Sequence, residues 1–302
     1  LDEEPREFRC ALYVILKLPT ENPLKKYRAK KGLMQQMKRL IYQVYVPIRG
    51  ESKLYNLCVD SVAKYCEWHG IDHIVAREPT LKILPDMART GRNKNGLMKE
   101  AGYLPIYEKE QAFTYLDRYD QIAVIDADIY IRNTAPNIFN ELGDHDWGGV
   151  LERDLPLAPK HAAKIKAYSN VSFKAAPCNT VEWDWNANGA DFMNMGMMMF
   201  NKSIIKHIPE WQNPREFLHR PDFKDLVDGV GPLWHSTDQI LLNYWLKKSG
   251  ANVKHLDWKW NTLYRGATDE SIPAAYFVHF FMKEGLKSKG EDIDSIRKIL
   301  NI

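Results

Sequence analysis

A run of apolar residues that ends in two carboxylates constrains this chain more than any other feature. Residues 122–125 read Ile-Ala-Val-Ile, and Asp126-Ala127-Asp128 follows at once. The apolar run has the length and the β-branched content of a strand buried on both faces. Because an unpaired carboxylate is costly to bury, we expect both aspartates at the carboxyl edge of a sheet, where ligands bind in open α/β folds.

Two carboxylates separated by one residue are suited to a hard divalent cation. Mg2+ and Mn2+ take oxygen ligands and are commonly held where they meet a phosphate. The Asp-x-Asp triplet by itself is also common in surface turns and helix caps. The preceding strand pattern favours the metal site, because a turn does not need four consecutive apolar residues.

The composition is that of an ordinary folded protein. The chain has 302 residues, of which 45% are hydrophobic and 27% charged, and its net charge of +3 gives no support for nucleic-acid binding. No apolar run approaches the ~20 residues that a transmembrane helix needs. Without internal repeats or low-complexity linkers, we predict one domain over residues 39–302 after an N-terminal extension at 1–38.

The cysteines indicate a reducing compartment. Cys10, Cys58, Cys66 and Cys178 form no CxxC pair, and the middle two fall in an apolar helical pattern. We therefore predict buried free thiols and a cytoplasmic location. Because the chain begins at Leu1 rather than at methionine, a lumenal location after removal of an N-terminal anchor stays open. The oligomeric state stays open as well, a homodimer included.

Sequence patterns predict alternating strands and helices. A strand over 41–48, a helix from Ser52 to about Trp68 that stops at Gly70, and a strand over 71–76 describe a βαβ unit in a parallel sheet. Further strands are predicted at 147–151, 191–200, 253–258 and 275–281, and further helices at 108–119, 238–249 and 293–300. The fold class is therefore α/β.

The segment 154–190 is predicted to be irregular. It contains Pro156, Pro159 and Pro177 and the aromatic run Trp183-Asp184-Trp185. A long irregular segment in a compact domain is often a substrate loop. We therefore expect the segment to contact a substrate.

Three later motifs follow the Asp-x-Asp triplet in a fixed order. They are Asn194-x-Gly196 in a strand, Asp238-Gln239 at the start of a helix that continues with Leu-Asn, and His279 at the end of a strand. In this order and at these separations, residues 41–287 resemble the glycogenin-like retaining glycosyltransferases of family 8. The resemblance implies a GT-A fold, with a mixed, mostly parallel central sheet flanked by helices and the Asp-x-Asp triplet at the carboxyl edge of a central strand.

The resemblance also implies a donor site. Asp126, Asp128 and His279 would hold Mn2+, or Mg2+, against the two phosphates of a nucleotide-sugar. Without the family, His279 reads as a core histidine. Lys283 or Lys287 would contact the same phosphates, with Lys109 nearby, and Tyr55 is the nearest aromatic residue for stacking on the base.

The remaining motifs would surround the donor sugar. Asn194 and Gly196 resemble the pair that approaches the sugar, and Asp191 would accept sugar hydroxyls. Asp238 and Gln239 resemble the pair near the anomeric carbon, where a retaining enzyme needs a nucleophile or an ion-pair stabiliser. Asp238 also suits a simple helix cap.

The resemblance has gaps, and they leave two features open. Met282 stands where the family has glycine, and no Pro-Trp follows Lys287, so the phosphate-binding lysine is not specified. The family's Thr-Asn-Asp-x-Tyr segment after the first strand is also absent, so the nucleotide base is not specified either.

We predict a hexosyltransferase that moves a sugar from a UDP-linked donor to a sugar or glycan acceptor. Because aromatic rings stack on the apolar faces of sugars, the run Trp183-Asp184-Trp185 is the predicted acceptor loop. A sugar-phosphate nucleotidyltransferase is one alternative, disfavoured because no Gly-x-Gly follows Val46. A non-catalytic glycan-binding protein on the same fold is the other, disfavoured because the aspartates and histidine of the motifs are all present.

Overall fold

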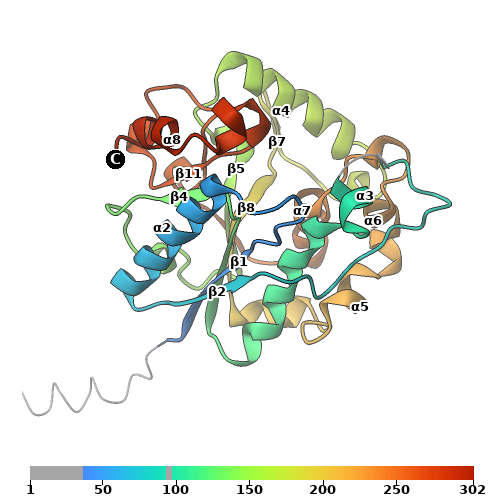
Figure 1. The fold of residues 1–302 in the computed structure, drawn as a ribbon. Helices are drawn as coiled ribbons and strands as arrows, with labels where there is room; N and C mark the ends of the chain where they lie inside the picture. The colour runs from blue at the N-terminus through green and yellow to red at the C-terminus, as the bar shows by residue number, and fades with distance from the viewer. Residues whose placement is uncertain (1–36, 93–96) are drawn as a thin grey trace, which may run out of the picture. The chain divides into compact units, whose positions relative to one another are not determined.

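The computed structural model describes residues 37–92 and 97–302, and residues Met37–Ile302 form one compact unit (Figure 1). The extension predicted at residues 1–38 lies outside the described residues apart from its last two positions, as does Cys10. Cys58, Cys66 and Cys178 are buried and free, as predicted. Within the described residues, no helix is long and apolar enough to cross a membrane.

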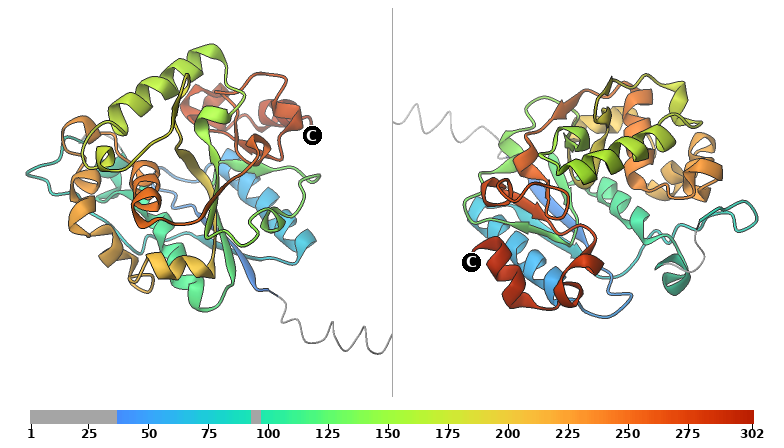
Figure 2. Two further views of the ribbon diagram at one scale, coloured as in Figure 1. Left: turned by 180° about the vertical axis from the view of Figure 1, so that it is seen from behind. Right: turned by 90° about the horizontal axis from the view of Figure 1, so that it is seen from above.

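A six-stranded sheet forms the centre of this unit, in the order β2-β1-β3-β8-β5-β9. The strands are β1 (Arg39–Val44), β2 (Asp72–Ala76), β3 (Gln121–Ile125), β5 (Trp147–Leu151), β8 (Met193–Asn201) and β9 (Val253–His255). Strand β8 is antiparallel to β3 and β5, and the other adjacent pairs are parallel. The predicted class, a mixed and mostly parallel sheet flanked by helices, is confirmed (Figure 2).

Alternate residues of the central strands face different layers. Leu40, Ile122 and Val124 pack in the cluster that contains Phe113 of the segment before β3 and residues of helix α7 (Asp238–Ser249). Ile41, Ala123 and Ile125 pack in the cluster that contains residues of helix α2 (Lys53–His69). Because helices cover both faces, the strand before Asp126 is apolar without interruption.

The methionine run of β8 fills this core. Met195, Met197, Met198 and Met199 are each at most 1% exposed. Gly148 and Gly149 of β5 make room for the methionine side chains, because a Cβ on Gly149 would lie 2.9 Å from Sδ of Met193. The run is therefore core packing rather than a binding surface.

Helices α2, α7 and α8 (Ile293–Leu300) agree with the predicted helices. Helix α2 ends at Gly70 and α7 at Gly250, both in the left-handed conformation that glycine adopts without strain. The helix predicted at 108–119 is a 3-10 helix, η1 (Pro105–Asp117). Shorter α-helices in the described part of the chain are α3 (Leu97–Ala101), α5 (Pro214–Leu218) and α6 (Lys224–Asp228).

The prediction of an irregular segment at 154–190 was wrong. Helix α4 spans Pro159–Ser172, and a short hairpin of β6 (Trp185–Asn186) and β7 (Gly189–Ala190) follows it. Pro159 occupies the first turn of α4, where its missing N–H costs nothing, so this proline starts a helix instead of breaking one. The buried side chains of α4 are few, Ile165, Ser169 and Ser172, which explains its weak sequence pattern.

Three predicted strands are shorter in the structure than in the sequence pattern. The strand predicted at 41–48 ends at Val44, the strand predicted at 253–258 ends at His255, and the strand predicted at 275–281 is β11 (Phe277–His279). Pro47 cannot donate to a sheet, and Asp257 caps a 3-10 turn over Trp258–Trp260. Further 3-10 turns are η2 (Ile138–Asn140), η3 (Glu152–Asp154), η4 (Cys178–Thr180), η5 (Lys202–His207), η6 (Pro221–Phe223), η7 (Gly231–Leu233), η9 (Ile272–Ala274), η10 (Lys283–Gly285) and η11 (Lys287–Gly290).

A second, three-stranded sheet brings the C-terminal part of the chain to the end of β3. It has the order β10-β11-β4, with β10 at Thr262–Leu263 and β4 at Ile129–Ile131. Strand β4 begins directly after Asp128, and its antiparallel register pairs Ile129 with His279. The N–H of Phe280 donates to the carbonyl of Asp128 over 2.9 Å. This pairing fixes His279 beside the Asp-x-Asp triplet.

Candidate functional site

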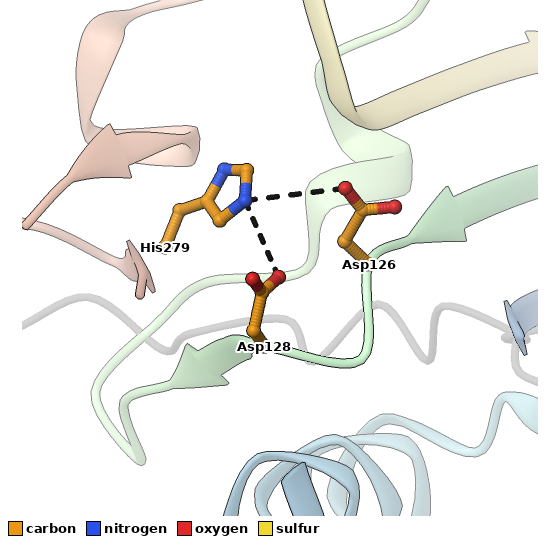
Figure 3. A group of neighbouring side chains, drawn as sticks. All are labelled: Asp126, Asp128 and His279. Carbon is orange, nitrogen blue, oxygen red and sulfur yellow. Dashed lines mark ion pairs between the residues drawn. The ribbon is translucent and has the colours of Figure 1, made fainter. Parts of the chain in front are cut away.

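Asp126, Asp128 and His279 form a compact group at the carboxyl end of β3 (Figure 3). Nε2 of His279 lies 3.3 Å from Oδ1 of Asp128 and 3.9 Å from Oδ2 of Asp126. One ligand atom from each residue lies within 4.8 Å of the others. Two carboxylates and an imidazole at this spacing are a candidate site for a divalent cation.

The ring of His279 is oriented from its far side. Its Nδ1 lies 3.0 Å from Oδ1 of Asn261, and Nδ2 of Asn261 donates to Oδ1 of Asn194. Oδ1 of Asn261 therefore accepts a hydrogen bond from Nδ1–H, and in the neutral ring this leaves the lone pair of Nε2 directed at the aspartates. Burial disfavours the imidazolium, but the carboxylate of Asp128 outweighs burial and raises the pKa of His279. The site thus attracts positive charge.

Lys109 connects this group to a third carboxylate. From η1, its Nζ lies 3.0 Å from Oδ1 of Asp126, 2.9 Å from the carbonyl of Met195 and 2.6 Å from Oδ2 of Asp238. Burial lowers the pKa of Lys109, but the two aspartates outweigh burial and raise it. An ammonium group has three protons. The three contacts match that number, so Lys109 is positioned to balance carboxylate charge rather than to reach for a phosphate.

Asp238 is the first residue of α7, but it does not cap the helix. The cap is Thr237, whose hydroxyl accepts a hydrogen bond from the N–H of Gln239. Asp238 is 2% exposed, and its burial raises the pKa of its carboxyl despite the ion pair with Lys109. A buried carboxylate with a single cationic partner at a cavity wall is placed for a functional role more than for helix capping.

Glu152 is a buried carboxyl that sequence reasoning missed. Its Oε2 accepts hydrogen bonds from Nδ2 of Asn194 over 3.3 Å and from Nε2 of Gln239 over 3.1 Å. It is 4% exposed, and burial raises its pKa to about 7. Glu152 follows strand β5 directly, as Asp126 follows β3. An acidic residue at the end of an apolar strand is therefore the sequence signal that could have identified Glu152.

Gly196 serves a purpose different from the one expected of it. A Cβ at this position would lie 2.3 Å from Cε1 of His279 and 2.9 Å from Oδ1 of Asn194. The space above Gly196 is thus taken by the imidazole of a candidate metal ligand. The glycine permits close packing of His279, whereas the sequence suggested close approach of a sugar.

Two adjoining cavities converge on the aspartates. A cavity of about 460 Å3 is lined by Asp126, Asp128, His279, Glu152, Asn194, Gly196, Asp238 and Gln239, with His161, Lys164 and Tyr168 of α4 on its wall. A cavity of about 320 Å3 shares Lys109, Asp126 and Asp128 with it and adds Tyr45, Ile48 and Tyr55. Tyr55, the residue predicted to stack on a base, therefore lines the cavity that adjoins the aspartates.

Three of the predicted site residues contact other side chains and lie outside the linings of the two cavities. Asp191 accepts from Nζ of Lys247 over 2.5 Å, and Lys287 pairs with Asp292. Nζ of Lys283 lies over the ring of Tyr55, 4.2 Å from its centroid. None of the three lines either of the two cavities.

The predicted acceptor loop also lies away from the cavity. Trp183 packs on Phe173, and its Nε1 donates to the carbonyl of Cys178. Trp185 contacts Lys174, and Asp184 pairs with Arg153. The cavity wall on this side is α4, which supplies aromatic and cationic groups that the sequence pattern did not mark.

No protein-family model matches the chain, and no curated protein matches it. The fold is similar to a crystal structure of a glycosyltransferase involved in the glycosylation of the major capsid of PBCV-1. That match has a TM-score of 0.52 and 13% sequence identity, and it covers 85% of this chain and 99% of that chain. At this identity the similarity shows a glycosyltransferase-like fold alone.

A second solved structure, A197 from STIV, has a TM-score of 0.32 and 9% identity over 74% of this chain and 83% of that chain. This similarity is too low to carry an argument.

Proposed function

We propose that this protein is a metal-dependent glycosyltransferase of the family 8 type that transfers a hexose from a UDP-linked donor to a sugar or glycan acceptor. The observation that carries the proposal is the group of Asp126, Asp128 and His279 at the carboxyl edge of β3, with ligand atoms within 4.8 Å of one another. This is the edge at which open α/β sheets bind nucleotides. The glycosyltransferase-like fold supports the same class.

The donor set fits Mn2+, with Mg2+ as the alternative. Carboxylate oxygens suit both ions, and the imidazole of His279 favours Mn2+ because nitrogen is a softer ligand. The contact between Nδ1 and Asn261 directs Nε2 of His279 toward the site. When bound, the cation neutralises charge on the departing nucleoside diphosphate.

The two cavities divide the donor between them. The recess beside Tyr45 and Tyr55 suits the base, because aromatic rings stack on flat ligands. The larger cavity suits the sugar, since Glu152, Asn194 and Gln239 present carboxylate and amide groups to hydroxyls. The diphosphate then lies between them, at the aspartates that both cavities share.

The chemistry proposed at the anomeric carbon is charge stabilisation with retention of configuration. Asp238 is paired with Lys109, which weakens it as a nucleophile. The side-chain oxygen of Gln239 accepts one long hydrogen bond, 3.3 Å from the N–H of Met195, and remains available to positive charge. This arrangement favours an oxocarbenium-like ion pair over a covalent intermediate.

The experiment that tests the function is a panel of nucleotide-sugars incubated with the protein and Mn2+. Slow metal-dependent hydrolysis of one UDP-sugar is the expected result, since hydrolysis reports the donor even without an acceptor. Lack of hydrolysis of every donor would contradict the proposal, and release of pyrophosphate from a sugar phosphate and a nucleoside triphosphate would favour a nucleotidyltransferase. Once an acceptor is found, NMR of the product linkage tests retention, and a β-product from an α-linked donor would exclude it.

A further inference from the structure

We call the cavity of about 460 Å3 that is proposed to hold the sugar the sugar cavity. A third cavity opens next to it, on the side of His279. It measures about 330 Å3 and shares His161, Lys164, Phe281 and Met282 with the sugar cavity. Lys160, Arg265, Glu284 and neighbouring backbone complete its lining. We call this the basic recess, after Lys160, Lys164 and Arg265. Phe281, one of its lining residues, follows the candidate metal ligand His279 by two positions.

The basic recess is built by the start of α4. Lys160 and Lys164 lie four residues apart, on the same face of the helix. The N–H of Ala158 donates to the carbonyl of Gly266 over 2.8 Å, and the ring of His161 contacts Phe281 edge-on. A Cβ on Gly266 would lie 2.7 Å from Cδ2 of His161, so this glycine lets the two segments approach closely. The recess is therefore held together by buried packing as well as by loops.

The cations of the recess differ from Lys109 and Lys287 in their surroundings. Across the described part of the chain, no acidic group lies within 4.0 Å of the side chains of Lys160, Lys164 or Arg265. Arg265 donates to the carbonyl of Gly285, and Glu284 is the acidic residue that lines the recess with these cations. In contrast, Lys109 is committed to Asp126 and Asp238, and Lys287 to Asp292.

Charge balance indicates what these cations are for. Asp126, Asp128 and Asp238 carry three negative charges, and Lys109 with a divalent cation would cancel them. The diphosphate of a nucleotide-sugar adds further negative charge. Among the described lysines and arginines that line the first two cavities, Lys164 is the one with no carboxylate within 4.0 Å. Guanidinium and ammonium groups bind phosphate oxygens with strong, charge-assisted hydrogen bonds.

We propose that Lys164 and Arg265, assisted by Lys160, bind the diphosphate of the donor. They would take the role that the resemblance gives to Lys283 or Lys287, of which Lys287 pairs with Asp292 and Lys283 lies over the ring of Tyr55, at the recess proposed for the base. This inference rests on the proposed function, since it needs a nucleoside diphosphate donor. Lys164 and Arg265 are both exposed, so their substitution leaves the core intact.

The test is calorimetry with nucleoside diphosphates in the presence of Mn2+. UDP, GDP, ADP and CDP are first titrated into the wild-type protein, and the tightest is compared with its own monophosphate. Lys164→Gln and Arg265→Gln are then measured in the same way, with Lys287→Gln as the matched control. We expect each of the two variants to lose about tenfold in diphosphate affinity and less in monophosphate affinity, and the control to keep both.

The outcomes separate this inference from the function on which it rests. If the wild-type protein binds a nucleoside diphosphate and both variants keep that affinity, the inference is overturned and the proposed function stands. An equal loss in Lys287→Gln would also overturn it, because the effect would then be general charge rather than contact. If the wild-type protein binds no nucleoside diphosphate, the proposed function fails and the inference fails with it.

Discussion

The imidazole of His279 occupies the space that a side chain at Gly196 would fill. A Cβ on residue 196 would stand 2.3 Å from Cε1 and 2.7 Å from Nδ1 of the ring, far inside van der Waals contact. The N–H of Gly196 is held by Oδ1 of Asn194, and its carbonyl accepts from the N–H of Asp126 over 2.7 Å. One glycine of the core sheet thus sets the positions of two candidate metal ligands.

Gly196→Ala is expected to weaken metal binding, because the added methyl group displaces His279 from the aspartates. We expect Mn2+ affinity, measured by calorimetry, to fall about tenfold or more, as it does when a residue that orients a metal ligand is changed. Gly148→Ala is the control, since the atoms nearest to its Cβ would be those of Leu142 and Met199 in the core. That variant should lower the melting temperature without changing Mn2+ affinity. An unchanged Mn2+ affinity in Gly196→Ala would argue against His279 as a ligand.

Lys109→Met is expected to destabilise the fold strongly. The substitution leaves the buried carboxylate of Asp238 and the partly buried carboxylate of Asp126 without their shared cation. Breaking a buried ion pair by removing one partner costs about 3–5 kcal/mol. Urea unfolding of the metal-free protein measures this loss. Adding Asp238→Asn removes one of the stranded charges, so the double variant should recover part of the lost stability. A double variant that is less stable than Lys109→Met would contradict the charge-balancing role.

Glu152 is expected to make stability fall as pH rises. Burial raises its pKa to about 7 in the folded protein, while an unfolded glutamate titrates near its usual value of 4.5. Between these values the unfolded chain releases a proton that the folded chain keeps, so the folded state loses stability with rising pH until about 7. The shift corresponds to about 3 kcal/mol. Glu152→Gln should remove this part of the pH dependence.

The measurement is urea unfolding of wild type and Glu152→Gln at about pH 5 and about pH 8, with a chelator present. The difference between the two proteins isolates Glu152 from other titrating groups. If the wild type and the variant change equally with pH, Glu152 titrates as an ordinary surface carboxyl and the buried position described for it is contradicted.

The sequence predicted the elements whose structure depends mainly on residues close to them in the chain. The strand before Asp126 is apolar because both of its faces are buried, and α2 and α7 end at glycines that adopt a left-handed conformation. These signals require no knowledge of the rest of the chain. They were therefore sufficient to predict the α/β class and the carboxyl-edge position of the aspartates.

The parts that the sequence could not predict depend on distant contacts. Lys109 and Asp238 are 129 positions apart by their numbering, and their pairing is visible only in the folded protein. Strand β4 is three residues long, so the sheet that carries His279 to Asp128 left no periodic pattern. Helix α4 begins with a proline and buries few side chains, which made a helix look like a loop.

The most direct measurement is calorimetric titration of UDP and Mn2+ into wild-type protein and into Asp128→Ala. Asp60→Ala serves as the control, because Asp60 is an exposed aspartate of α2 that does not line the donor cavities. Circular dichroism shows that each variant is folded. Because Asp128 is proposed to hold the cation that binds the diphosphate, Asp128→Ala should lose Mn2+-dependent UDP binding while Asp60→Ala keeps it. An Asp128→Ala protein that is folded and binds UDP and Mn2+ as the wild type does would contradict the metal site and the function proposed from it.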